Sequence, residues 1–263
     1  MTQGVYPVKY SVIVCNQRGK FLHWALKGIQ WQTLGDFETI VVDYGMDPPF
    51  GTMTAPLAKG PQPLRILRWE DSEWNHPRAR NIGIANARGE RIVIVNSDCL
   101  MAPTLLEEAG WLLDQDPHRQ IYWQRFDLSE EGLQALRSFD RPRELFGDGD
   151  NWHGRGWGDF HSLSTYGDFL MVERDVVMEY GGFDERASGW GVYDHDLACR
   201  LDRHGYPSFW AEGLRLVHLW HPQRPGLDAS WRRNIDALSP DFLAERDVRN
   251  QGRATFERYV VEG

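Results

Sequence analysis

Apolar and polar positions along the chain form two kinds of pattern. Short apolar runs rich in Val and Ile predict buried strands, and longer stretches with apolar side chains on one face predict helices. The predicted strands cover residues 10–15, 37–43, 64–69, 91–95, 121–128, 169–172, 208–211 and 214–220. The predicted helices cover residues 20–30, 77–87, 103–113, 130–138, 175–180 and 193–204. Strands that alternate with helices predict an α/β fold, with a mostly parallel sheet covered by helices on both faces.

Acidic residues follow two of these strands. Asp43 ends the run FETIVVD, and Asp98 follows the run RIVIVNSD. Ligands of open α/β sheets bind beyond the carboxyl ends of the strands. Asp98 either caps the next helix or holds a ligand at this edge. The helix predicted at 103–113 begins too late for a good cap, which favours a ligand.

The second half of the chain is less regular. Residues 141–166 are rich in Gly, Asp, His and Trp and predict a long loop, a feature that is often functional in compact domains. Trp152, His153 and Trp157 in this loop either close over a ligand or pack in the ordinary way. From residue 241 onward the sequence is polar and mixed, which predicts a helix and a tail. The chain contains no internal repeat and no clean linker.

Composition narrows the class of protein. The chain has 263 residues with a net charge of −9 and no basic cluster, which argues against a nucleic-acid partner. Its three cysteines are far apart and form no zinc pattern, as expected of reduced thiols in a cytoplasmic protein. No apolar run reaches membrane-spanning length, although peripheral attachment to a membrane stays open. Twelve tryptophans supply flat amphipathic rings that suit the apolar faces of sugars.

Four stretches, in this order along the chain, resemble a known enzyme family. They are SVIVCNQRGKFLHWALKGIQWQTLGDFETIVVD, HPRARNIGIANARGERIVIVNSD, GDFLMVERDVVMEYGGFDE and GWGVYDHDLACRLDRHGY followed by VHLWHP. Together they resemble the inverting glycosyltransferases of the GT-A fold and family-2 type, and the C-terminal half is similar to the β-1,4-galactosyltransferases. The resemblance covers most of residues 10–222.

The resemblance implies an architecture as well as a fold. It implies one GT-A-like catalytic domain over residues 1–225, followed by a helical extension over 226–263. Within the domain, the nucleotide-binding half would span about residues 1–117 and the acceptor-binding half about 118–225.

The resemblance also implies a reaction. A sugar would move with inversion from a nucleotide-sugar donor to a hydroxyl of a glycan, glycolipid or other small acceptor. The family most often uses UDP-sugars, while GDP- and dTDP-sugars stay open. Mn²⁺ or Mg²⁺ would bridge the diphosphate, and a carboxylate would deprotonate the acceptor.

The implied metal ligands are Asp98, His218 and His221. Asp98 aligns with the last acid of the family's Asp-x-Asp motif, and carboxylate oxygen suits a hard cation on a diphosphate. The first position of the motif is Asn96, which departs from the family and contributes no charge. Alternation along a strand points residues 218 and 221 to opposite faces, so we expect one histidine to be a ligand and favour His218.

The implied donor contacts lie at the strand ends and in the helix before Asp98. Asp43 would contact the base or ribose, although a plain turn role is the alternative, and the family's usual second acid is Tyr44 here. An arginine of HPRARN would bind the diphosphate, and we expect at least one of Arg78, Arg80 and Asn81 to be only solvated. The full implied set is Cys15, Gln17, Arg18, Asp43, Arg78, Arg80, Asn81, Asn96, Ser97 and Asp98.

Asp194 in GWGVYDHD aligns with the catalytic base of the family. The alternative is that it only places charge at a helix N-terminus. Asp196 points in a different direction on a helix, so both cannot serve as the base. The family's usual Glu before the base is Tyr193 here. The implied acceptor contacts are Trp157, Gly167, Asp168, Trp190, Gly191 and Tyr193.

Two other functions remain as alternatives. A nucleotidyltransferase would carry a Gly-rich basic loop after its first strand, and the sequence CNQRGKFL is not such a loop. A non-catalytic sugar- or nucleotide-binding protein of the same fold is favoured by Asn96, Tyr44 and Tyr193 and opposed by Asp98, Asp194 and His218.

Overall fold

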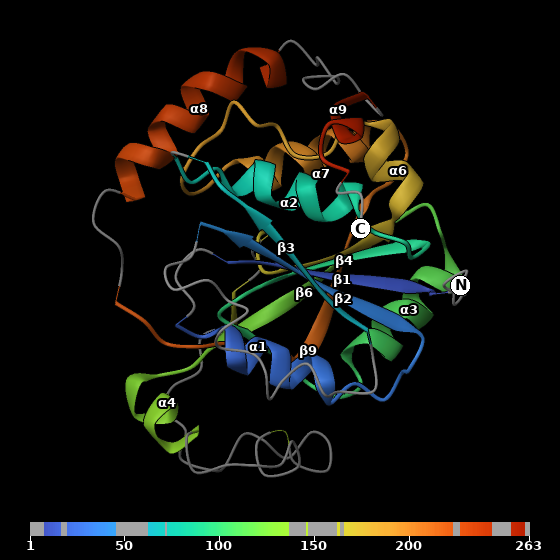
Figure 1. Ribbon diagram of the computed structural model, residues 1–263, viewed down its shortest axis with the longest axis vertical. Helices are drawn as coiled ribbons and strands as arrows, with labels where there is room; N and C mark the ends of the chain where they lie inside the picture. The colour runs from blue at the N-terminus through green and yellow to red at the C-terminus, as the bar shows by residue number, and fades with distance from the viewer. Residues whose placement is uncertain are drawn as a thin grey trace.

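The computed structural model describes most of the chain (Figure 1). The described residues are 8–16, 20–45, 63–71, 73–136, 146, 162–163, 166–222, 227–243 and 254–260. The strands are β1 (Tyr10–Asn16), β2 (Phe37–Tyr44), β3 (Leu64–Trp69), β4 (Arg91–Asn96), β5 (Cys99–Met101), β6 (Gln120–Asp127), β7 (Ser162–Leu163), β8 (Phe169–Glu173) and β9 (Ser208–His218). The helices are α1 (Leu22–Gln30), α2 (His76–Ala85), α3 (Leu105–Gln115), α4 (Glu130–Leu136), α6 (Arg174–Glu179), α7 (Tyr193–Arg203), α8 (Leu227–Leu243) and α9 (Ala254–Glu257).

All of these strands belong to one sheet. Their order is β3-β2-β1-β4-β8-β6-β9-β5, with β7 paired to β6. The pairs among β3, β2, β1 and β4 are parallel, as is β6 with β9, whereas β8 and β5 run antiparallel to their neighbours. The parallel arrangement predicted from the sequence therefore holds for the first half of the sheet, and the second half is mixed.

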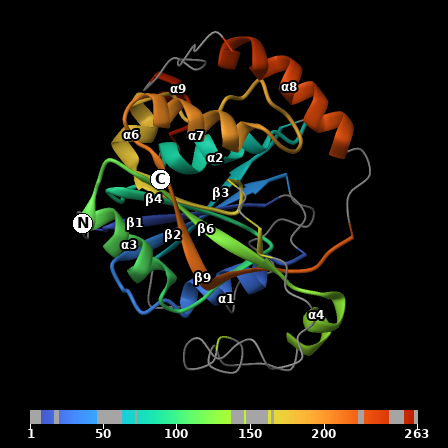
Figure 2. The same ribbon diagram turned by 180° about the vertical axis from the view of Figure 1, so that it is seen from behind.

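Helices cover both faces of the sheet, which gives two separate cores. Figures 1 and 2 show α2, α6, α7, α8 and α9 on one side and α1 and α3 on the other. Strand β1 serves both sides: Ile13 packs into the core beneath α2 and α7, and its neighbours Val12 and Val14 pack against α1 and α3. This period of two within an almost continuous apolar run is what a central strand of a covered sheet requires.

The predicted elements near residue 100 differ from the structure. The chain turns directly after Asp98 into β5, a short strand that the sequence analysis missed, and α3 begins at Leu105 with Thr104 before it. Asp98 is therefore not the cap of that helix. Three residues of β5 give too short a pattern to reveal a strand from periodicity alone.

The two strands predicted at 208–211 and 214–220 form one strand, β9. Its pairing with β6 shifts register, because Trp123 faces Ala211 while Arg125 faces Leu216. The extra residues include Gly213, whose positive φ of 104° suits glycine. A β-bulge, and not a break between strands, thus explains the polar interruption in the apolar pattern.

One edge of the sheet gathers the polar strand ends. Strands β1, β2, β4, β6 and β9 all point the same way, since β4 and β6 are both antiparallel to β8 and β9 is parallel to β6. Their last residues therefore meet at this edge. The reversed strand β8 begins there, so Gly167 and Asp168 join the same edge from the opposite chain direction.

The C-terminal residues pack onto the body of the protein. Leu238 of α8 and Phe256 of α9 are buried in the core that also contains Ile82 of α2. The backbone oxygen of Tyr259 accepts a hydrogen bond of 2.7 Å from Asn86 Nδ2. Within the described ranges, no helix combines the length and hydropathy needed to cross a membrane.

Gly28 allows α1 to lie close to β5, which gives a test of the packing. A Cβ there would lie 2.7 Å from the backbone nitrogen of Met101, so Gly28→Ala forces a backbone shift. Overpacking costs about 1–3 kcal/mol and outweighs the roughly 1 kcal/mol that alanine gains in a helix. We expect urea unfolding to show net destabilisation. Gly35→Ala is the control, because its Cβ meets nothing within 4 Å. Equal midpoints for the two variants would contradict the prediction.

Candidate active site

Asp98, His218 and His221 form a cluster at the polar edge of the sheet. One ligand atom from each lies within 4.8 Å of the other two. Asp98 Oδ2 is 3.7 Å from His218 Nε2 and 3.4 Å from His221 Nε2. One carboxylate and two imidazoles that face a common point make a donor set suited to a divalent cation.

Both histidines reach Asp98, contrary to the expectation that only one would do so. Side chains alternate only while the chain remains in a strand. Strand β9 ends at His218, and the chain changes direction before His221, so the alternation rule does not apply there. Cys99 pairs with His218 across β5 and β9, which brings Asp98 to the same place.

The pKa values of Asp98 and His218 are both shifted by their surroundings. Burial alone would raise the pKa of Asp98, but the two imidazoles outweigh burial and hold that pKa well below its usual range. Burial alone would lower the pKa of His218. The hydrogen bond to Asp127 and the charge of Asp98 outweigh that effect and raise the pKa of His218 to about 9.

Asp127 is a part of the cluster that the sequence analysis missed. It ends β6, and its Oδ1 lies 2.9 Å from His218 Nδ1, so His218 directs its other ring nitrogen toward Asp98. Arg125 Nε lies 3.1 Å from the same carboxylate oxygen. A signal for it exists in the sequence, because Asp127 is an acid at a strand end like Asp43 and Asp98.

Asn96, the departure from the family motif, has two partners in the structure. Its Nδ2 donates to Asp168 Oδ1 at 2.9 Å, and its Oδ1 accepts from Arg80 Nη2 at 3.1 Å. A carboxylate at this position would lose the donor and would face the charge of Asp168. An amide is therefore the side chain that can bridge an arginine and an acid here.

Asp168 is buried and fully occupied by these contacts. Besides Asn96 it accepts from Arg125 Nη1 at 2.9 Å. That Asp168 contacts an acceptor stays a prediction, and in this structure its carboxylate is engaged by Asn96 and Arg125. A residue just before a strand can point either way, and its partners on β4 and β6 could not be read from the sequence.

Asp194 lies in the first turn of α7 and forms an ion pair with Arg80 of α2. The Arg80 side chain is only 2% exposed, and its Nη2 also donates to the Gly167 oxygen at 2.8 Å. A Cβ at Gly167 would lie 3.0 Å from Asp194 Oδ2, so glycine leaves the room that this carboxylate occupies. Asp196 is separate, because its buried carboxylate pairs with Arg200 at 2.9 Å.

Tyr193, the residue before Asp194, is buried. Its hydroxyl lies 2.6 Å from His76 Nδ1, and burial raises its pKa to about 12. That Tyr193 contacts an acceptor likewise stays a prediction. Trp190 and Gly191 lie in the segment just before α7, and Trp190 is exposed.

The other expected donor residues have varied surroundings. Asp43 is buried and pairs with Arg68 Nη1 at 3.3 Å, and the Cys15 thiol is buried near the end of β1 with its pKa raised to about 12. Arg78 pairs with Glu185 and Asp71. Ser97 lies with Asp98 in the turn between β4 and β5. Gln17, Arg18 and Trp157, as well as Trp152 and His153, lie outside the described residues.

Asn81, an expected donor contact, is engaged by other parts of the protein in this structure. Its side chain is completely buried, donates to the Phe183 oxygen at 2.8 Å and accepts from the Phe183 nitrogen at 2.9 Å. These contacts fix the segment that leads from α6 to α7. Asn81 therefore supports the position of Asp194 from below.

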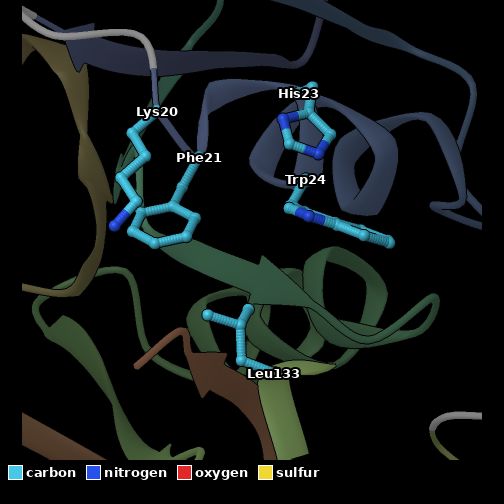
Figure 3. Close-up of a pocket in the computed structure, with 5 residues that line it drawn as sticks. All are labelled: Lys20, Phe21, His23, Trp24 and Leu133. Atoms are coloured by element: carbon cyan, nitrogen blue, oxygen red, sulfur yellow. The ribbon is translucent and has the colours of Figure 1, made fainter. Parts of the chain in front are cut away.

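A pocket of about 340 Å³ lies beside the histidine cluster, and Figure 3 shows the side chains that line it. The residues that line it are Lys20, Phe21, His23, Trp24 and Leu133. The Phe21 ring lies 6.3 Å from the ring of His221, centroid to centroid. The pocket thus adjoins the cluster on the α1 side, while Arg80 and Asp194 come from α2 and α7 across the sheet.

The chain belongs to Glycosyl transferase family 2, which matches residues 11–180. The matched region includes the ends of β1, β2, β4 and β6, together with Arg80, Asn96, Asp98 and Asp168, but not β9 or α7. The fold is that of the GT-A glycosyltransferases, in agreement with the expected fold class.

Curated relatives are distant and much longer. The protein y4gI of Sinorhizobium fredii is 23% identical over 248 residues, which cover 88% of this chain and 27% of that protein. The O-antigen biosynthesis protein RfbC of Myxococcus xanthus is 24% identical over 184 residues, which cover 69% of this chain and 13% of RfbC. The chain thus spans about a quarter or less of these relatives.

Solved structures support the same fold. The TarS structure of S. aureus in complex with UDP has a TM-score of 0.65 at 14% identity, covering 96% of this chain and 69% of TarS 1–349. The mannosyltransferase PcManGT of Pyrobaculum calidifontis, in complex with GDP-Man and Mn²⁺, has a TM-score of 0.62 at 20% identity, with the same coverage of 96% and 69%.

The raised pKa of His218 predicts a pH dependence of stability in the metal-free protein. A histidine whose folded pKa of about 9 exceeds its ordinary 6.5 stabilises the protein fully below the lower value. We expect the free energy of unfolding in EDTA to fall between these two pH values, by up to about 3 kcal/mol. His218→Gln should flatten this profile, whereas the exposed control His118→Gln should keep it. Parallel profiles for the two variants would refute the assignment.

Proposed function

We propose that the protein is an inverting, divalent-metal-dependent glycosyltransferase that uses a nucleotide-sugar, with a UDP-sugar as the favoured donor. The proposal rests chiefly on one observation: a metal-type cluster and the Asp194 carboxylate, which is paired with the buried Arg80, flank Asn96 at one edge of the sheet. Membership of Glycosyl transferase family 2 supports the class of reaction. The likeness of the C-terminal half to β-1,4-galactosyltransferases remains part of this proposal.

Asp98, His218 and His221 would hold the cation. Imidazole nitrogen suits manganese better than magnesium, which prefers oxygen ligands, so the donor set favours Mn²⁺. When bound, the cation supplies positive charge to the diphosphate of the leaving nucleotide. The contact between Asp127 and His218 would keep the imidazole oriented as a ligand.

Asp194 would act as the general base. Inversion requires a carboxylate on the face of the donor sugar opposite the leaving group. Arg80 would keep Asp194 ionised and in a fixed rotamer, since the buried guanidinium contacts Asp194, Asn96 and the Gly167 oxygen at once. Asp194 would then accept the proton of the acceptor hydroxyl as the new glycosidic bond forms.

The donor class is supported by analogy. TarS has been solved with UDP-GlcNAc and PcManGT with GDP-Man and Mn²⁺, so related folds accept different bases. We propose a glycan or a comparable hydroxyl-bearing molecule as the acceptor. The three free cysteines, two of them buried, support a reducing compartment such as the cytoplasm.

The donor and the cation can be tested together by thermal denaturation. A ligand that binds only the folded state raises the midpoint by mass action. We expect UDP with Mn²⁺ to raise it clearly, UDP with Mg²⁺ to raise it less, and Asp98→Ala to abolish both effects. Asp116→Ala, at an acid outside the cluster, is the control. If GDP, dTDP or CMP acts instead of UDP, the donor assignment is wrong. If no nucleotide acts, the proposed function is wrong.

The base can be tested by replacing Asp194 with Asn. The amide keeps the size of the side chain but cannot accept the proton, and a general base contributes about 10²–10⁴ to the rate. We expect release of UDP from a UDP-sugar to fall by that factor, with the UDP–Mn²⁺ midpoint shift preserved. Asp202→Asn changes an exposed acid of the same helix and should retain activity. Nucleotide binding without turnover by the wild type would instead indicate a non-catalytic binding protein.

A further inference from the structure

The segment Ser188–Val192, here called the strap, leads directly into the helix that carries Asp194. Three of its residues, Gly189, Gly191 and Val192, have positive φ values of 75°, 89° and 74°. Among the residues that the structure describes, Val192 is the one non-glycine residue with a positive φ. This conformation is costly for a β-branched side chain. Surrounding contacts must therefore hold the strap in place.

Helix α8 supplies those contacts from outside the region that matches the family. Asn234 Oδ1 accepts from the Ser188 nitrogen at 3.0 Å, and Asn234 Nδ2 donates to the Gly191 oxygen at 2.8 Å. Ser230 Oγ accepts from the Trp190 nitrogen at 2.7 Å. Ser230 and Asn234 are four residues apart, lie on one face of α8 and are both buried.

The glycines of the strap allow this close approach. A Cβ at Gly189 would lie 2.6 Å from Ser230 Oγ, and a Cβ at Gly191 would lie 2.6 Å from Trp231 Cδ1. The strap and α8 are therefore in direct contact, and the Trp231 indole lies against Gly191. Figures 1 and 2 show α8 alongside α7 and α2 on the same side of the sheet.

Two exposed indoles border this contact. Trp190 is 52% exposed and Trp231 is 46% exposed, although both are large apolar side chains anchored by ordered backbone. Trp190 adjoins Gly191 in the chain, and Trp231 contacts Gly191 from α8. Trp190 is therefore part of the strap and Trp231 contacts it, and the strap ends two residues before Asp194.

The chemistry of this surface fits a sugar ring. Exposed indole faces bind the apolar C–H faces of a pyranose, while the hydroxyls around the ring stay solvated. Rigid aromatic side chains lose little conformational entropy when they bind. A position beside the strap, on the α7 side of Asn96, is where an acceptor has to approach Asp194, because the metal-type cluster lies on the other side.

We propose that Trp231 of α8 extends the acceptor site, forming with Trp190 a stacking surface for a pyranose ring of the acceptor. Ser230 and Asn234 are positioning residues that hold the strap, and with it Trp190, against α8. This inference rests on the proposed function, since it treats the strap as the acceptor side of a transferase. It gives a role in acceptor binding to α8, which the sequence analysis describes only as part of a helical extension.

A glycan array of mono- and oligosaccharides tests the surface against many candidate acceptors at once. The labelled full-length protein is titrated on the array with UDP and Mn²⁺ present. We expect Trp231→Ala to weaken binding to the recognised glycans at least about tenfold, the loss expected for one stacked aromatic anchor. Trp111→Ala removes an indole that is 60% exposed on α3, across the sheet, and should bind like the wild type.

The UDP–Mn²⁺ midpoint shift is measured in parallel and separates the two proposals. Trp231→Ala should keep that shift in full. Equal glycan binding by Trp231→Ala and the wild type would overturn the proposed stacking surface. A wild-type protein whose thermal midpoint shifts with UDP and Mn²⁺ but which binds no glycan would also overturn it. Glycan binding that depends on Trp231, without any midpoint shift by UDP and Mn²⁺, would support the stacking surface and refute the proposed glycosyltransferase function.

The positioning role is tested at Ser230. Ser230→Ala removes the hydroxyl that accepts from the Trp190 nitrogen and leaves Trp231 in place. We expect weaker glycan binding with an unchanged UDP–Mn²⁺ shift, and recovery in Ser230→Thr, which restores the hydroxyl. Glycan binding that does not change in Ser230→Ala, or does not recover in Ser230→Thr, would overturn the positioning role.

Discussion

The site depends on the buried guanidinium of Arg80. It forms an ion pair with Asp194 from α7, contacts Asn96 at the end of β4 and donates to the backbone before β8. Burial of a charge is costly unless it is paired and hydrogen-bonded, so each of these partners is constrained by the others. The rings of Phe183 and Tyr193 complete the enclosure at 4.9 and 5.3 Å from the guanidinium carbon. One side chain thus fixes the relative positions of a helix, a strand end and a loop.

Most of the fold could be predicted from the sequence, because each strand of a sheet covered on both faces needs an almost continuous apolar run. The runs that predict β1, β2, β3 and β4 and the helices between them lie within a few residues of the observed bounds. The rule that ligands bind at the carboxyl ends of such strands then pointed to Asp43 and Asp98. The second half was harder, because β5 is short, β9 contains a bulge and β8 reverses direction.

Side-chain partners could not be predicted in the same way. His221 joins Asp98 only because the chain leaves β9 at His218, and Asp168 is buried only because β8 places it between Asn96 and Arg125. These are contacts between elements far apart in sequence, and periodicity carries no information about them. Asn96 illustrates the gain from structure: it departs from the family motif in sequence, and in the fold it bridges a cation and an anion.

The pairing of β5 with β9 has a consequence for how the Asp98 cluster can respond to its ligand. Cys99 faces His218 in the backbone ladder, and the Leu219 backbone nitrogen donates to the backbone oxygen of Asp98 at 2.8 Å. The spacing between Asp98 and His218 is therefore set by sheet hydrogen bonds and does not depend on a loop. A cation held there would meet a nearly fixed backbone spacing between Asp98 and His218, while side-chain rotation and the segment after β9 that carries His221 would allow adjustment. Selection among ions would then reside in the stiffness of the backbone as much as in the chemistry of the ligands.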